Sequence, residues 1–106
     1  MNNRWRIEEI LQASLRKVDA AGRRGGEEFI AILPGTDLAG ASLLADRIRS
    51  RIAAHEFNFD AKTSQVTASF GVVEYEGSKL DKFIQAADEL LYQAKGAGRN
   101  CVISEP

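Results

Sequence analysis

The stretch RRGGEEFIAIL, residues 23–33, decides how this chain folds. Glycine accepts the positive φ angles that tight hairpin loops need, so Gly25 and Gly26 predict a hairpin between two short extended segments. The apolar run FIAIL, residues 29–33, is typical of a strand, and Pro34 ends it. The sequence therefore predicts a hairpin with an apolar second strand.

Two adjacent carboxylates, Glu27 and Glu28, directly follow the glycines. Their like charges repel each other, so a positive partner is expected beside them. Hard cations such as Mg²⁺ take oxygen ligands and share them with phosphate-bearing substrates. The alternative is a solvent-exposed polar turn without any ligand, and the local pattern alone favours that alternative because short motifs often match by chance.

Helical and extended patterns alternate along the rest of the chain. Apolar residues recur at helical spacing in three segments, and the turn PGTD can cap the second of them from Thr36 or Asp37. The β-branched segment VTASFGVV is typical of a buried strand. The predicted elements are a helix over 4–17, the hairpin, a helix carrying Ala41, Leu44, Ala45, Ile48 and Ile52, a strand over 66–73, a helix over 80–95 and a strand over 100–103.

This order predicts the α/β class, as an α+β sandwich with helices packed on a sheet. A helix joins the strand at 29–33 to the strand at 66–73, so we expect the two to run parallel in one sheet through a right-handed crossover. The length of 106 residues suits one domain, residues 1–106.

Composition excludes several functional classes. The net charge of -1 gives no reason to expect a nucleic-acid polymer or a polybasic membrane patch. We expect neither a membrane span nor a signal peptide, because no apolar run is long enough and the N-terminus is charged. The single cysteine, Cys101, excludes an internal disulfide and fits the cytoplasm.

Two further motifs carry paired charges near the ends of predicted helices. In AKGAGRN, Lys95 and Arg99 flank glycines at a predicted helix end, which suits either a terminal phosphate or simple capping of the helix dipole. In LRKVD, Arg16 and Asp19 are three residues apart and could simply form a surface pair.

Taken together, RRGGEEF, ILPGTD, ADRIRSRI, VTASFGV and ADELLYQAKGAGRN resemble, in order and spacing, the GGDEF domain of diguanylate cyclases. The resemblance runs from about Leu11 to Ile103. It implies a ferredoxin-like, nucleotidyl-cyclase-like sheet, and condensation of two GTP molecules into cyclic di-GMP with release of two pyrophosphates. It also implies Mg²⁺ or Mn²⁺ as cofactor and two domains that face each other.

The resemblance implies roles for the hairpin residues. Glu27 would bind metal and assist deprotonation of the attacking hydroxyl, and Glu28 would be the second acidic residue of the metal site. The glycines Gly25 and Gly26 would keep the turn open against the nucleotide.

It also implies two groups of cationic residues. Lys95 and Arg99 would hold the terminal phosphates of GTP. Arg16 and Asp19, with Arg47 from the following helix, would form an inhibitory site for cyclic di-GMP, because guanidinium groups fork onto phosphate and guanine acceptors.

The N-terminal part departs from the family pattern. Family domains begin with a D-x-LTGL-x-N-R type segment, followed by a strand with an acidic metal ligand and an FK-x-I-N-D type segment that recognises guanine. No acidic residue precedes Glu8 here. We therefore expect a chain that is truncated relative to the family, lacks the first, central strand and is inactive alone.

Two consequences and two alternatives follow from that departure. Without the central strand, residues 29–33 and 66–72 would keep open edges, so we expect a partner to fill them, most simply in a homodimer. One alternative function is a non-catalytic cyclic di-GMP receptor that uses Arg16 and Asp19. The other is a folding or interaction module without a ligand.

Overall fold

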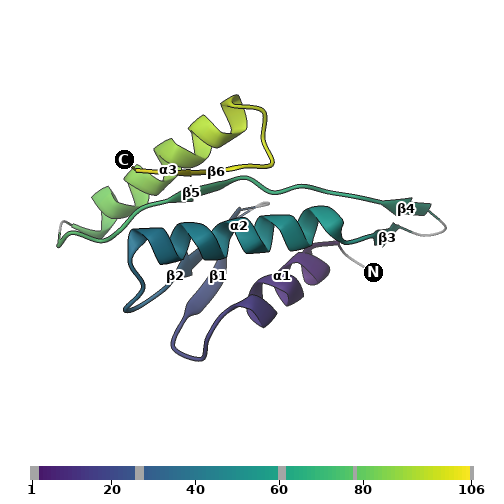
Figure 1. Ribbon diagram of the computed structural model, residues 1–106, viewed down its shortest axis with the longest axis horizontal. Helices are drawn as coiled ribbons and strands as arrows, with labels where there is room; N and C mark the ends of the chain where they lie inside the picture. The colour runs from purple at the N-terminus through teal and green to yellow at the C-terminus, as the bar shows by residue number, and fades with distance from the viewer. Residues whose placement is uncertain (1–2, 26–27, 60–61, 78, 106) are drawn as a thin grey trace.

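The computed structural model describes residues 3–25, 28–59, 62–77 and 79–105. The described elements are α1 (Asn3–Ser14), β1 (Ala20–Gly25), β2 (Glu28–Ile32), α2 (Leu38–Ala54), β3 (Phe57–Phe59), β4 (Lys62–Ser64), β5 (Phe70–Val72), α3 (Leu80–Gly96) and β6 (Val102–Ser104) (Figure 1). The molecule is elongated, 48 × 32 × 23 Å, because the β3–β4 hairpin projects from one end (Figure 1). The predicted mixed α/β class is confirmed.

The strands form three separate pairs among the described residues. β1 and β2 make the predicted antiparallel hairpin, β3 and β4 make a second one, and β5 pairs in parallel with β6. The expectation that β2 and β5 share one sheet is wrong. Figure 1 shows the β1–β2 hairpin below α2 and the β5–β6 pair above it. Among the described residues β2 is hydrogen-bonded to β1 and β5 to β6, and no ladder joins β2 to β5.

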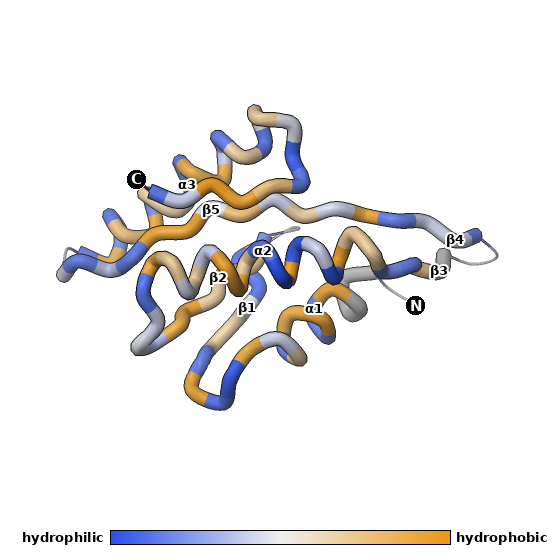
Figure 2. The backbone as a smooth tube through the Cα atoms, viewed as in Figure 1, coloured by the Kyte–Doolittle hydropathy of each residue, from blue (hydrophilic) through white to orange (hydrophobic). Residues whose placement is uncertain are grey.

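The hydrophobic core lies between α1, α2 and the chain that follows α2. Leu11, Ile48, Ile52 and Phe57 are buried against one another, and Phe29 from β2 packs onto this cluster. The predicted apolar stripe of α2 is therefore confirmed. Figure 2 shows hydrophobic residues along α1, α2 and β5, whereas β4 is hydrophilic.

Helix α2 begins where the sequence predicts. The side chain of Asp37 accepts a hydrogen bond of 2.8 Å from the amide of Gly40, so Asp37 rather than Thr36 is the N-cap. Helix α1 ends at Ser14, earlier than predicted. The chain then turns, with the amide of Asp19 bonded to the carbonyl of Arg16.

Helix α3 packs closely on β5, and Gly71 is the residue that permits it. A Cβ atom at position 71 would lie 2.4 Å from the carbonyl oxygen of Ala87 and 2.5 Å from the amide nitrogen of Leu91. Both are helix backbone atoms, which cannot move aside independently. The glycine therefore sets how closely the helix approaches the strand.

Two features of the fold go beyond the predicted elements. The segment between the predicted second helix and the predicted strand at 66–73 contains β3, whose Phe57 side chain is only 1% exposed. On α3, the large side chains of Tyr92 and Leu80 are 79% and 61% exposed. In the part of the chain that is described, no helix is long and apolar enough to cross a membrane.

Candidate functional site

The β1–β2 hairpin carries the glycine–glutamate motif to the surface beside α3. Gly25 ends β1 and pairs with Glu28, the first residue of β2. The predicted site residues Gly26 and Glu27 lie outside the described residues. Arg23 pairs with Phe29, so Arg24 has no opposite residue and forms a bulge just before the tip.

The carboxylate of Glu28 lies between two cations of the protein. Its Oε2 atom is 3.7 Å from Nζ of Lys95, and its Oε1 atom is 3.9 Å from Nη1 of Arg24. The protein itself therefore supplies positive counter-charges to Glu28.

The C-terminal end of α3 brings the two predicted phosphate-binding residues onto one bend. Lys95 lies in the last turn of the helix, and Arg99 follows it with a left-handed φ of 62°. The amide of Arg99 bonds to the carbonyl of Ala94 at 3.0 Å. The side-chain oxygen of Asn100 accepts a 3.0 Å bond from Arg49, which ties the bend to α2.

Arg24 and Asp88 are functional candidates that the sequence analysis missed. The guanidinium group of Arg24 forms an ion pair with the Asp88 carboxylate on α3. That hydrogen bond raises the pKa of Arg24 above its usual value, with smaller contributions from the charges of Asp88 and Glu28. The available signal was the position of Asp88, seven residues before Lys95 and hence on the same face of α3.

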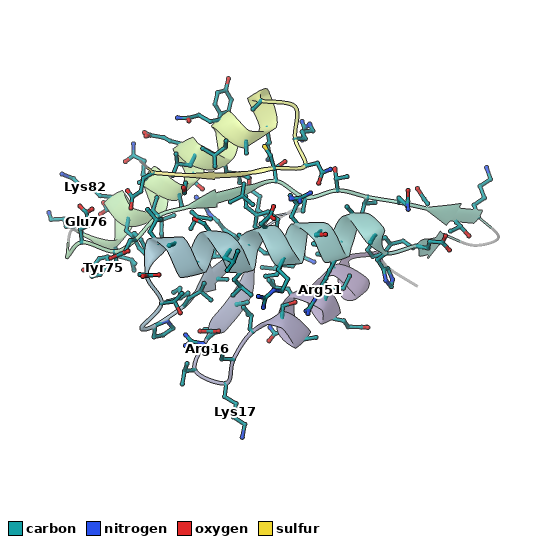
Figure 3. The ribbon with its side chains drawn as sticks, viewed as in Figure 1. Arg16, Lys17, Arg51, Tyr75, Glu76 and Lys82 are labelled. Carbon is teal, nitrogen blue, oxygen red and sulfur yellow. The ribbon has the colours of Figure 1, made fainter. Side chains whose placement is uncertain are left out.

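Arg16 and Asp19 lie in the turn between α1 and β1 and bind each other. Nη2 of Arg16 is 2.8 Å from Oδ1 of Asp19, and it also donates to the carbonyl of Pro34 at 2.7 Å and to Oγ1 of Thr36 at 2.9 Å. This pairing clamps the turn to the loop that precedes α2. Figure 3 shows Lys17, the next residue, pointing away from the molecule.

The electrostatics of this pair follow from its hydrogen bonds. The side-chain bond from Arg16 lowers the pKa of the Asp19 carboxyl, against a smaller opposing effect of burial. The same bond raises the pKa of the Arg16 guanidinium. The side chain of Asp19 is 1% exposed and that of Arg16 is 54% exposed. A ligand could therefore reach the arginine more easily than the aspartate.

Arg47, the third predicted inhibitory-site residue, lies exposed on α2. Among the described residues no hydrogen bond or ion pair joins it to Arg16 or Asp19. One helical turn later, Arg51 donates a 2.8 Å bond to Oγ of Ser14 on α1. The structure therefore brings two of the three predicted residues together and leaves Arg47 apart from their bonded cluster.

Of the two glutamates predicted to bind metal, Glu28 is the one that the structure describes. Glu28 offers oxygen donors, which Mg²⁺ prefers, and its side chain is 42% exposed. Within the described ranges no group of three or more His, Cys, Asp or Glu side chains is arranged to hold a metal ion. Glu28 can offer oxygen atoms to a cation, but the described residues alone do not complete a metal site.

Comparison with known proteins assigns the family. The model of the family described as "Diguanylate cyclase, GGDEF domain" matches residues 5–101. The chain therefore belongs to the GGDEF family, as the resemblance in its motifs predicted.

Several characterised relatives are similar to this chain. It is 40% identical over 91 residues to diguanylate cyclase DgcP of Pseudomonas aeruginosa. The aligned region covers 85% of this chain and 14% of that protein. It is 38% identical over 99 residues to the response regulator PleD of Caulobacter vibrioides, with 90% of this chain and 22% of that protein covered. The chain thus spans less than a quarter of either relative.

Solved structures agree with this assignment. Diguanylate cyclase SiaD of Pseudomonas aeruginosa matches with a TM-score of 0.88 and 33% identity, over 93% of this chain and 38% of that one. The active GGEEF domain of a diguanylate cyclase from Vibrio cholerae matches with a TM-score of 0.86 and 31% identity, over 96% of this chain and 65% of that one.

Proposed function

We propose that residues 1–106 act as one GGDEF-type unit that contributes the metal- and triphosphate-binding half of a diguanylate cyclase site. The reaction condenses two GTP molecules into cyclic di-GMP and releases two pyrophosphates. The observation that carries the proposal is the 3.7 Å approach of Glu28 to Lys95, which joins the hairpin motif to the cationic end of α3.

The charges at this junction suit a nucleotide that arrives with a metal ion. Phosphoryl transfer depends on positioning and charge stabilisation more than on covalent help from the protein. Glu28 would exchange Lys95 for a cation, and Lys95 would then be available to the terminal phosphates together with Arg99. In this structure the charges of Glu28 and Lys95 compensate each other.

Glu27 and Glu28 would hold Mg²⁺ or Mn²⁺ through their carboxylates. When bound, the metal supplies charge stabilisation to the phosphate oxygens. Gly25 and Gly26 would keep side chains out of the approach to the nucleotide. The similarity to the Vibrio cholerae domain supports these assignments, because that protein is an active GGEEF domain and this chain carries the same pentapeptide.

Calorimetric titration with GTP tests this proposal. We expect the 106-residue chain to bind GTP in the presence of Mg²⁺ and to bind it much more weakly when the metal is removed by chelation. Guanosine monophosphate, which lacks the terminal phosphates, should bind weakly under both conditions. Absence of any metal-dependent heat with GTP would contradict the proposal.

We predict that the 106-residue chain alone produces no substantial cyclic di-GMP from GTP and Mg²⁺. Its sequence contains no match to the family's acidic metal ligand or to its guanine-recognising Asn–Asp segment. Loss of a metal ligand removes stabilisation of the transition state as well as affinity. Chromatography of the reaction mixture measures the product, and robust turnover would show that these residues are dispensable.

We further propose that the functional unit contains two copies, since the reaction joins two nucleotides. Within the described residues, β2 pairs with β1 and β5 with β6, so the other edges of β2 and β5 have no partner strand there. Light scattering at increasing concentration measures the assembly. A monomer at all concentrations, with and without GTP, would contradict the two-copy proposal.

A second candidate function is a non-catalytic receptor for cyclic di-GMP at Arg16, Asp19 and Arg47. The observation in its favour is the 54% exposure of Arg16, whose bonds to the described residues use Nε and Nη2. Its Nη1 group makes no hydrogen bond within the described part of the chain and could donate to a phosphate.

For this receptor we predict that Arg16→Ala weakens cyclic di-GMP binding by about ten- to a hundredfold, the range for a lost charge-assisted contact. Lys17→Ala is the matched control, because this neighbouring cation points away from the molecule (Figure 3). Calorimetry measures the affinity of wild type and of both variants for cyclic di-GMP. Equal affinity in wild type and Arg16→Ala would rule out an inhibitory site at Arg16.

A further inference from the structure

Two ion pairs of opposite direction join the β1–β2 hairpin to α3. Arg24 of the hairpin contacts Asp88 of the helix, whereas Lys95 of the helix approaches Glu28 of the hairpin at 3.7 Å. Asp88 and Lys95 are seven residues apart, so they lie on one face of α3, two turns or about 10 Å along its axis. The hairpin is positive in one pair and negative in the other. A shift of the hairpin along α3 that brought like charges together would therefore be unfavourable.

Strand β1 has an irregular register at Arg24, the residue that pairs with Asp88. Arg23 is opposite Phe29 and Gly25 is opposite Glu28, which leaves Arg24 as the extra residue of a β-bulge. Bulges bend a strand and redirect a side chain, and they occur frequently beside active sites. Here the redirected side chain belongs to a residue that contacts α3.

Arg24 also acts on the orientation of Glu28. Its Nη1 atom is the partner of Asp88 and lies 3.9 Å from Oε1 of Glu28, while Oε2 of the same carboxylate faces Lys95. Each carboxylate oxygen of Glu28 therefore has its own cation. All of these side chains are about 40% exposed, so the pairs add little to stability and their effect is on geometry.

We propose that Arg24 is a positioning residue, whose pair with Asp88 holds the hairpin against α3 so that Glu28 faces Lys95. The functional consequence rests on the proposed diguanylate cyclase site, in which Glu28 and Lys95 serve metal and phosphate. The geometric part, hairpin order through the pair, does not depend on that function.

The experiment compares Arg24→Gln, Asp88→Asn, the double variant and the charge-conserving Arg24→Lys. Glu89→Gln is the matched control, because it removes the neighbouring exposed carboxylate of the same helix. Hydrogen exchange without nucleotide reports the order of amides 20–25 and 28–32. Calorimetry with Mg²⁺ and GTP, at a temperature where every variant is folded, measures the affinity of the site for GTP.

A positioning role predicts equal effects from the two single variants. Exchange of the hairpin amides should rise and GTP affinity should fall by about two- to fivefold in each, with no further loss in the double variant. Arg24→Lys should recover most of the affinity, and Glu89→Gln should match wild type.

Other outcomes overturn the proposal in distinct ways. If Arg24→Gln weakens GTP binding while Asp88→Asn does not, Arg24 binds the nucleotide directly and is not a positioning residue. Unchanged hairpin exchange in both single variants would show that the pair does not order the hairpin. If wild type shows no metal-dependent GTP binding, the proposed function fails, and the exchange measurement still decides the geometric claim.

Discussion

Replacing Gly71 with alanine should lower the free energy of unfolding by about 3 kcal/mol, the upper part of the range for overpacked sites. The added Cβ would lie 2.4 Å from the Ala87 carbonyl oxygen and 2.5 Å from the Leu91 amide nitrogen. Relief requires α3 to move off β5 as a unit, which would disturb the packing of Ala94, a fully buried residue of that helix. Thermal unfolding should show a midpoint lower by roughly 10–20 °C.

Gly22→Ala is the control for this prediction. Gly22 lies in β1, and a Cβ atom there would have no heavy atom within 4 Å apart from its chain neighbours. Its effect should stay within about 0.5 kcal/mol, as for surface substitutions without a special mechanism. Equal melting temperatures for Gly71→Ala and wild type would mean that α3 does not pack on β5 as closely as the structure shows.

The sequence predicted best the elements that local chemistry determines. Pro34 and the Gly25–Gly26 pair mark the hairpin, and Asp37 caps α2 as the turn motif predicts. The α2 stripe is buried because helical spacing places Ala45, Ile48 and Ile52 on one face.

Features that depend on tertiary contacts were harder to predict. Phe57 and Phe59 alternate around Asn58, a pattern of only three residues that was too short to separate a strand from a loop. Tyr92 directly follows Leu91, a residue of the helix face that packs on β5. Its exposure could be recognised only once the position of β5 was known. The expected common sheet failed because sequence order gives no information about which strands become neighbours.

Some residues of the candidate site were likewise predicted from the sequence, and others were not. The family resemblance implied that Glu28, Lys95 and Arg99 act at one site, and the structure has Glu28 beside Lys95. Arg24 was not among the predicted site residues, because its contact with Asp88 joins residues 64 positions apart. The bulge that redirects it leaves no mark in the sequence beyond a second arginine.

Lys95→Ala should weaken binding of GTP with Mg²⁺ by about ten- to a hundredfold, since it removes a charge-assisted contact to phosphate. Binding of guanosine monophosphate should change little, because that ligand lacks the terminal phosphates that Lys95 is proposed to hold. Lys82→Ala is a suitable control on the same helix. Figure 3 shows Lys82 near the opposite end of α3.

The most direct test of the proposed site is one calorimetric comparison of GTP binding in the presence of Mg²⁺ between wild type and Lys95→Ala. The account predicts measurable binding to wild type, a loss of about ten- to a hundredfold in the variant, and no such loss in Lys82→Ala. Equal GTP affinity in wild type and Lys95→Ala, or no metal-dependent binding to wild type, would contradict the claim that the hairpin and the end of α3 form a nucleotide site.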